Sequence, residues 1–254
     1  MKFLYNNFSI YKTRFFLYNY NDNDFRIVKI KSCKESGFEE IKKSNFIDYN
    51  NEEIQRISLS RTKRNIRELS LCNNFQYFCT FTIDSQKCDR FSLDICQNKL
   101  KKILHKIKRI NKDFAYLIIT EKHKNGAFHF HGLMKNINDL YINENGYLSS
   151  EIFSKELGFN SFDKIKDYSK CCNYITKYIS KDCVKNSHNQ IYISSRGLNK
   201  ASREEFSNID FTPSFTNDFV EIKDFSLNNL TNEEKLYFLS LKEGKKNFLS
   251  YNIL

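Results

Sequence analysis

The sequence predicts an α+β fold, because stretches with the patterns of strands and of helices alternate along its 254 residues. Strand propensity is high in the aromatic, threonine-containing segment 75–84 and in the apolar segment 113–121. The turn signal Asn125-Gly126 joins the second of these to residues 128–134, so they are expected to pair as an antiparallel hairpin. Residues 90–111 place apolar side chains at helical intervals, which predicts an amphipathic helix with its lysines toward solvent.

Further elements are predicted on both sides of this hairpin. The strand pattern recurs at 25–32 and 190–195, and helices are expected at 58–73, mainly at 161–183, and at 231–244. Residues 135–160, which include Gly146 and Gly158, are predicted to be a loop.

The chain is basic, with 41 Lys and Arg against 30 Asp and Glu and a net charge of +11. Such a balance indicates an anionic partner, most often nucleic acid, although a general bias toward solubility is the alternative. No apolar run is long enough to span a membrane, and the N-terminus lacks the apolar core of a signal peptide. We therefore expect no membrane association and an intracellular, cytoplasmic location.

Two common kinds of site are not indicated by the sequence. None of the eight cysteines forms a C-x-x-C pair, so they are expected to be reduced, mostly buried thiols rather than ligands of a structural zinc. There is no G-x-x-x-x-G-K-[ST] phosphate-binding loop, which argues against a fused ATP-driven helicase.

The segment 126–134 places two of the five histidines on one strand. Because side chains alternate along a strand, His129 and His131 point to one face and Phe130 to the other. Such a pair is consistent with metal ligation, with a polar surface pair, or with chance.

The length of the hairpin loop determines whether a carboxylate joins these histidines. A three-residue loop ending at Gly126 pairs Glu121 with His129 and places both on one face, with His123 as a weaker candidate nearer the turn. A two-residue loop would shift the pairing by one residue and turn Glu121 away. With the first register, Glu121, His129 and His131 could hold a divalent ion that polarises a phosphate oxygen.

A second cluster of polar side chains lies in the segment 173–182. At helical spacing, Tyr174, Lys177, Tyr178 and Lys181 share one stripe, while Cys172, Ile175, Ile179 and Cys183 form another that can pack on a sheet. A phenol beside ammonium groups is a reasonable phosphoryl acceptor, and a chance surface pattern is the alternative.

Basic residues are also dense in the predicted helix 58–73, for which Ser60 is a plausible N-cap. A solvated helix face and a contact with DNA phosphates are equally consistent with this pattern. Its candidates for DNA binding are Arg61, Lys63, Arg64 and Arg67.

The order of these motifs resembles the three motifs of HUH endonucleases, and more closely the rolling-circle replication initiator (Rep) proteins of small bacteriophages and related plasmids and viruses. The matching features are FCTFTID at 78–84, E-x7-H-F-H at 121–131 and Y-I-T-K-Y-I-S-K at 174–181, with LGF at 157–159 and SSRGL at 194–198. Many single-tyrosine relatives have one Y-x-x-K, whereas this chain has two overlapping copies. It is therefore open which tyrosine would cut first.

The resemblance implies a central antiparallel sheet with the histidine strands in its middle and helices packed on it, an RRM-like or ferredoxin-like core. It implies Glu121, His129 and His131 as ligands of Mg²⁺ or Mn²⁺. Tyr174 and Tyr178 would be the nucleophiles, Lys177 and Lys181 would contact phosphate, and Arg196 would join the DNA-binding residues. The resembling domain spans 56–200, leaving extensions at 1–55 and 201–254 without an assigned role.

Together, these features predict a metal-dependent, site-specific nickase and strand transferase that initiates rolling-circle DNA replication. Its expected partners are single-stranded origin DNA and a helicase and polymerase of the bacterial host cell. The alternatives are a relaxase or transposase with the same chemistry, and a non-catalytic nucleic-acid-binding protein.

Overall fold

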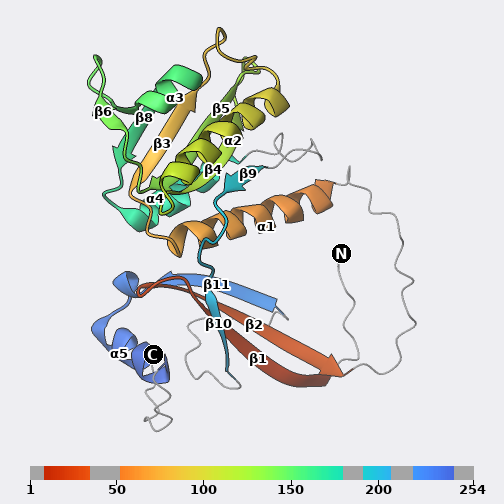
Figure 1. Cartoon of the computed structure of the whole chain (residues 1–254). Coiled ribbons are helices and arrows are strands. Elements are labelled where there is room, and N and C mark those ends of the chain that lie inside the picture. Colours follow the sequence, from red (N-terminus) through yellow and green to blue (C-terminus); the bar gives the residue numbers. More distant parts are fainter. Residues whose placement is uncertain (1–8, 35–51, 180–190, 207–219, 243–254) are drawn as a thin grey trace. The chain divides into compact units, whose positions relative to one another are not determined.

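The computed structural model describes residues 9–34, 52–179, 191–206 and 220–242 (Figure 1). These residues fall into two compact units, one within 44–200 and the other formed from parts of 1–43 and 201–254. No helix among the described residues has the length and apolar character needed to cross a membrane.

The unit within 44–200 is built on a five-stranded sheet in the order β8-β3-β5-β4-β9, in which every neighbouring pair is antiparallel. Its strands are β3 (Tyr77–Thr82), β4 (Ala115–Lys122), β5 (Phe128–Lys135), β8 (Asn160–Lys164) and β9 (Tyr192–Ser194). The histidine-bearing β5 is therefore the central strand, flanked by β3 and β4. The predicted α+β fold, with helices packed on an antiparallel sheet, is confirmed.

One face of this sheet is covered by α2 (Leu93–Ile110) and the short α3 (Glu151–Glu156). The apolar stripe of α2, which includes Leu100 and Leu104, is fully buried with Phe81, Phe130 and Ile118 from the three central strands. The even-numbered residues of β4 and β5 thus form the larger core.

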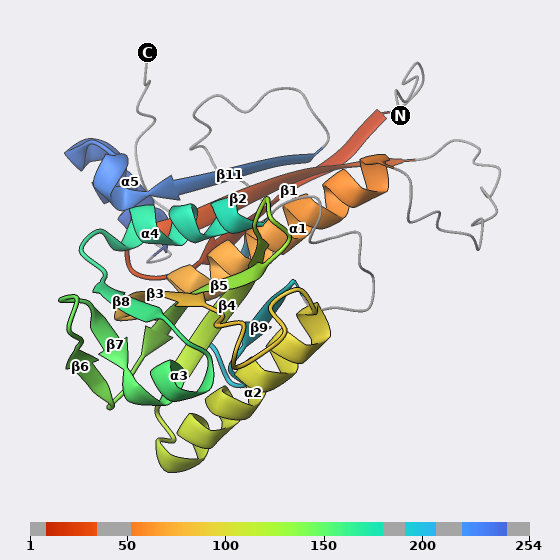
Figure 2. The ribbon, with the colours of Figure 1, turned by 90° about the horizontal axis from the view of Figure 1, so that it is seen from above.

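The opposite face is covered by α1 (Glu52–Leu71), α4 (Tyr168–Tyr174) and the 3₁₀ turn η1 (Ile175–Tyr178). Ile66 of α1 and Ile175 of η1 are buried there against Leu117 and Leu133 of the sheet. Figure 2 shows α1 and α4 on one side of the strands and α2 on the other.

The segment 135–160, predicted to be a loop, contains a small hairpin and a helix. The hairpin consists of β6 (Leu140–Ile142) and β7 (Leu148–Ser150), and α3 begins directly after it, with the Ser150 hydroxyl accepting a hydrogen bond from the Phe153 amide. The prediction was wrong because strands of three residues and a helix of six are too short to produce a visible hydrophobic period. Burial of Phe153 in the core stabilises α3 instead.

The segment 161–183, predicted to be mainly helical, begins as an edge strand. Phe162 of β8 pairs with Cys79 of β3 and is buried, so pairing with the sheet overrides the local helical pattern. The helix starts only after Asp167, whose carboxylate accepts a hydrogen bond from the Lys170 amide. The part of this prediction beyond residue 179 lies outside the described residues.

The second unit contains a four-stranded antiparallel sheet, ordered β10-β1-β2-β11, and the helix α5 (Asn232–Lys242). The strand predicted at 25–32 is β2 (Asp24–Lys34), and the helix predicted at 231–244 is α5. The sequence did not indicate β1 (Ser9–Asn19), β10 (Ser202–Phe206), β11 (Val220–Ser226) or the turn η3 (Leu227–Asn229). The two terminal segments, expected as separate extensions, contribute strands to one sheet.

Candidate functional site

The β4–β5 hairpin has the three-residue loop that the sequence predicted. His123 and Ala127 close the loop, with the His123 amide donating to the Ala127 carbonyl at 2.9 Å, and Glu121 pairs directly with His129. Gly126 has a φ of +89°, which is the left-handed conformation that this kind of loop requires. Glu121, His129 and His131 therefore lie on the same face of the sheet as α1 and η1.

The Glu121 carboxylate lies at the centre of this group. Its Oε2 atom is 2.8 Å from Nε2 of His131 and 3.3 Å from Nε2 of His123. The His123 ring stacks on the His129 ring with centroids 3.6 Å apart. Three imidazoles and one carboxylate are thus gathered at the loop end of the hairpin.

Two threonines of β3, which the sequence reasoning missed, contact the other ring nitrogen of each strand histidine. Oγ1 of Thr80 is 3.3 Å from Nδ1 of His131, and Oγ1 of Thr82 is 3.3 Å from Nδ1 of His129. A hydroxyl can donate or accept a hydrogen bond, so either tautomer of each imidazole can be satisfied. The alternation of threonine with buried phenylalanine in the segment 75–84 was the signal that could have revealed them.

Both strand histidines are kept neutral near pH 7. Burial, and then the neighbouring His123 and His131, lower the pKa of His129 to about 4. Burial also lowers the pKa of His131, although the hydrogen bond and charge of Glu121 oppose this. A neutral imidazole retains one nitrogen lone pair, which is the form that binds a metal ion.

The fit of a divalent ion to this group can be judged from its donor atoms. No three His, Cys, Asp or Glu side chains within the described ranges converge as a formed metal site. Glu121, His129 and His131 nevertheless supply one carboxylate and two neutral imidazoles from a single face, with the Glu121 oxygen already bonded to an imidazole nitrogen. These residue types suit a divalent ion, and convergence needs only side-chain rotation that the Thr80 and Thr82 hydroxyls can accommodate.

The turn η1 places the candidate nucleophiles over this group. The Tyr178 ring stacks on the His131 ring with centroids 3.8 Å apart and an interplanar angle of 18°. The Tyr178 hydroxyl donates to the Tyr174 hydroxyl at 2.7 Å. Buried Ile175 and Ile179 anchor the turn to the sheet, as the apolar stripe predicted. The structure therefore brings both tyrosines to the histidine strand.

The two phenols differ in their environments. Burial, followed by the hydrogen bond and charge of Tyr174, raises the pKa of Tyr178 above its ordinary value of 10. Tyr178 is thus a neutral phenol in the free protein, whereas the side chain of Tyr174 is more open to solvent, with 45% of its surface exposed.

Phe78 of β3 is a further component that the sequence did not single out. Its ring centroid lies 5.7 Å from that of Tyr174, 6.1 Å from that of Tyr178 and 6.0 Å from that of His131. These aromatic rings give the face a composition suited to stacking with unpaired bases.

The lysines of the tyrosine motif have separate outcomes. Lys177 is exposed, and its Nζ atom lies 5.2 Å from the centroid of the Tyr174 ring, in a cation–π contact. Lys181 lies outside the described residues.

The predicted DNA-binding residues fall in two different places. Nε of Arg67 donates to Oδ1 of Asn173 at 2.8 Å, which joins α1 to the residue preceding Tyr174. The rest of that set, Arg61, Lys63 and Arg64, lies further toward the start of the same helix. Arg196 follows β9 beside Tyr116, at the end of β4 opposite to Glu121, so it is not brought to the histidines.

The comparisons with known proteins support a role in replication. Residues 76–183 match the model of a family described as Replication-associated protein ORF2. This region contains β3, the histidine hairpin and both tyrosines. No curated protein and no solved structure shows significant similarity to the chain.

Proposed function

We propose that this chain initiates rolling-circle DNA replication by HUH chemistry, nicking one strand of an origin by tyrosine attack and later rejoining strands. The match of residues 76–183 to a family of replication-associated proteins supports the biological role. The excess of positive charge, +11 over the chain, favours a polyanionic substrate.

The observation that carries the chemical part of the proposal is the stacking of Tyr178 on His131 at 3.8 Å, with the Tyr174 hydroxyl 2.7 Å from that of Tyr178. Two phenol oxygens therefore lie beside the face that holds Glu121 and the strand histidines. A phosphate on this face could be reached by either oxygen with little rearrangement.

Glu121, His129 and His131 would hold Mg²⁺ or Mn²⁺. A divalent ion bound there supplies Lewis-acid polarisation of a phosphate oxygen, which makes the phosphorus a better electrophile.

In the first step, the phenol oxygen of one tyrosine attacks the phosphorus of the scissile phosphodiester. A bond forms between that oxygen and phosphorus as the bond from phosphorus to the 3′ oxygen breaks. The tyrosine proton is lost to solvent, and the departing 3′ oxygen takes up a proton to become a hydroxyl. The products are a 5′-phosphotyrosyl linkage and a free 3′-OH that a host polymerase can extend.

The second tyrosine allows a second transfer without release of the first DNA end. Because the phosphotyrosyl linkage is a phosphodiester, as is the bond that was cut, attack by a 3′-OH can reverse the step and join strands. Lys177, which lies over the Tyr174 ring, would favour the phenolate or a nearby phosphate.

Covalent capture of DNA tests this proposal. The full chain would be incubated with labelled single-stranded DNA from the replicon that encodes it, with Mn²⁺ or with excess chelator, and resolved on a denaturing gel. We expect a protein–DNA adduct with metal, none with chelator, and none from a His129→Ala, His131→Ala double variant. Binding without any adduct would favour the non-catalytic alternative, and full activity in chelator would reject the metal.

A further inference from the structure

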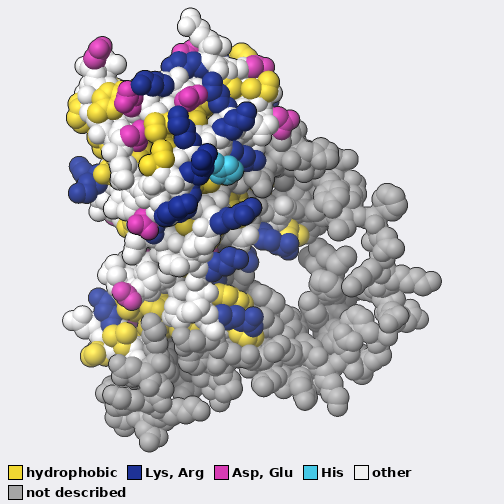
Figure 3. Space-filling view, in the orientation of Figure 1, with side chains coloured by type: hydrophobic (Ala, Val, Ile, Leu, Met, Phe, Trp, Pro, Cys, Tyr) yellow, Lys and Arg dark blue, Asp and Glu magenta, His cyan; other side chains and the backbone are white. Residues whose placement is uncertain are grey.

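The outer surface of α2 is the most basic surface of the unit that is not part of the candidate site. Within its 18 residues, α2 carries five lysines and one arginine against one aspartate, a net charge of +5 compared with +11 for the chain. Figure 3 shows Lys and Arg side chains gathered over the part of the unit where α2 lies. Because α2 covers the sheet face opposite to η1, this charge is separated from the tyrosines by the sheet.

The basic side chains form a row along the helix. At about 100° per residue, Lys99, Lys102, Lys106 and Arg109 fall within a stripe about 80° wide that runs about 15 Å along the axis. Lys102, Lys106 and Arg109 are exposed, and the buried stripe of α2 points the other way. The row is therefore held in place by the packing of Leu100 and Leu104, which are fully buried.

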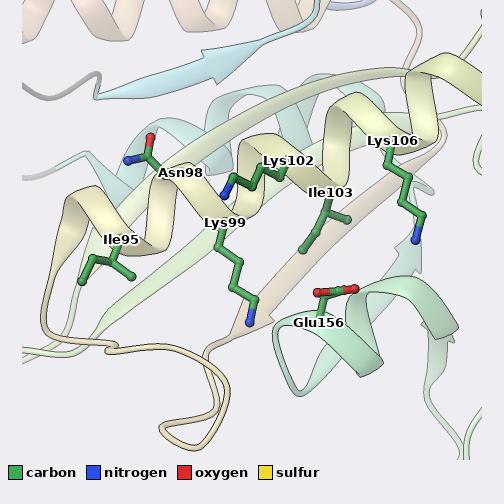
Figure 4. Close-up of a pocket in the computed structure, with 7 residues that line it drawn as sticks. All are labelled: Ile95, Asn98, Lys99, Lys102, Ile103, Lys106 and Glu156. Atoms are coloured by element: carbon green, nitrogen blue, oxygen red, sulfur yellow. The ribbon is translucent and has the colours of Figure 1, made fainter.

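A hollow of about 550 Å³ lies beside this row, between α2 and α3. Figure 4 shows Lys99 and Lys106 extending from α2 toward the side where Glu156 lies. Glu156 is the one acidic side chain in its lining, and it forms no ion pair with a described residue. Lys102, Lys106 and Arg109 likewise have no acidic partner among the residues that the structure describes, so their charge is not neutralised within this unit.

The chemistry of this surface suits phosphates and not bases. No Phe, Tyr or Trp occurs between residues 93 and 110, and none lines the hollow. Single-stranded nucleic acid is held largely by stacking of its bases on aromatic rings, which this surface cannot provide. Duplex DNA keeps its bases stacked inside and presents about nine phosphates, counting both strands, in 15 Å of its length.

We propose that the row on α2 is a second nucleic-acid site, which binds the phosphate backbone of duplex DNA. The aromatic face with Phe78, Tyr174 and Tyr178 would take the single strand, while α2 would hold neighbouring duplex. The proposal rests on the proposed function only in taking DNA as the nucleic acid. It predicts that duplex binding and strand cleavage can be separated by mutation.

The test compares two full-length variants that each lose three positive charges. The first is Lys102→Gln, Lys106→Gln, Arg109→Gln, and its control is Lys164→Gln, Lys166→Gln, Lys200→Gln, which removes exposed lysines elsewhere in the unit. Fluorescence anisotropy would measure binding to a labelled duplex and to a single strand of the same length over a range of salt concentrations. Adduct formation on single-stranded DNA would be measured in parallel.

We expect the α2 variant to lose at least about tenfold in duplex affinity near 0.1 M salt, with the slope of log affinity against log salt smaller by about 2.7, or 0.9 per lost phosphate contact. Its single-strand affinity and adduct yield should match those of the control. Equal duplex binding by the two variants would overturn the proposal, as would an equal loss for duplex and single strand. A wild-type chain that forms no adduct would reject the proposed nicking function and leave the duplex comparison valid.

Discussion

At the scale of single residues, the charge state of His129 depends on what surrounds it. The ring is partly buried, stacks on His123 and lies near His131, and each of these conditions disfavours a second proton. An imidazole kept neutral in this way is available to a metal ion at physiological pH, but its protonation opposes folding in acid.

This dependence gives a prediction for the metal-free protein. The pKa of His129 falls from 6.5 in the unfolded chain to about 4 in the fold, so the unfolded chain binds the proton more tightly. Its contribution to stability is therefore complete above pH 6.5 and is lost as the pH falls toward 4. Solvent screening of the partly exposed ring limits this loss to about 1–2 kcal/mol.

Urea unfolding at pH 7 and pH 5 would measure the effect. We expect His129→Asn to lose less stability between the two pH values than the wild type. The control is His105→Asn, at an exposed position of α2, and it should lose as much as the wild type. Identical pH dependence in all three proteins would refute the assignment to His129.

Glu121 gives a second prediction at this scale. Glu121→Gln keeps the size of the side chain and its ability to bond to His131, but it removes the negative charge that a cation requires. We expect the affinity for Mn²⁺, measured by calorimetric titration, to fall by at least about tenfold. Glu156→Gln, on the opposite side of the sheet, is the matched control. Equal affinities in these two variants would exclude Glu121 as a ligand.

The arrangement of the site residues on β4 and β5 could be predicted because it depends on local rules. Alternation along a strand places His129 and His131 together, and the left-handed Gly126 selects the loop that brings Glu121 opposite His129. Thr80 and Phe78 could not be found in this way, because their contacts depend on pairing between β3 and β5, which are separated by about 50 residues. Pairing at that distance leaves no local pattern in the sequence.

At the scale of secondary-structure elements, α1 joins the basic side chains to the tyrosine turn. Arg67 bonds to Asn173, and the Tyr168 hydroxyl donates to the Ser70 carbonyl at 2.6 Å, so α1 and α4 are fixed side by side. DNA phosphates bound along α1 would therefore be held close to Tyr174.

The basic residues of α1 can be tested without disturbing this junction. Arg61→Gln, Lys63→Gln, Arg64→Gln leaves Arg67 in place, and we expect it to weaken binding of single-stranded origin DNA. The salt slope should fall by about 0.7 for each lost contact with a single strand. The comparison is the variant at Lys164, Lys166 and Lys200, which loses the same charge. A slope equal to that of this control would identify the α1 residues as a solvated helix face.

Elements that carry a strong period, such as α2, were predicted within a few residues, whereas β8 was not. Phe162 and its neighbours become a strand because they complete the edge of the sheet beside β3. The same chain read locally has helical character. The end of the tyrosine helix also differs from the ideal pattern, because its last turn is the 3₁₀ turn η1, which places Tyr178 over His131.

At the scale of the whole molecule, the central sheet of the 44–200 unit separates two kinds of surface. One face carries imidazoles, a carboxylate and phenols, and the other is covered by a helix with a net charge of +5. The sequence indicated the basic character of the chain but not its division between the two faces. That division follows from which side of the sheet each helix covers.

The central claim is that Tyr174 and Tyr178 are nucleophiles. Phenylalanine retains the ring that packs on Phe78 and His131 and removes only the hydroxyl, so each single Phe variant should keep some cleavage through the remaining phenol. A second transfer, which releases a unit circle, should be impaired more than the first nick in either variant. The double variant should bind DNA with unchanged affinity.

The most direct measurement is peptide mass spectrometry of adducts trapped on single-stranded origin DNA with Mn²⁺, for the wild type, both single Phe variants and the double variant. We predict nucleotide-modified peptides at Tyr178 when residue 174 is Phe and at Tyr174 when residue 178 is Phe, with none in the double variant. Adducts confined to one tyrosine, with the variant at the other position fully competent in replication, would indicate a single-tyrosine enzyme. Adducts that persist in the double variant would contradict the mechanism.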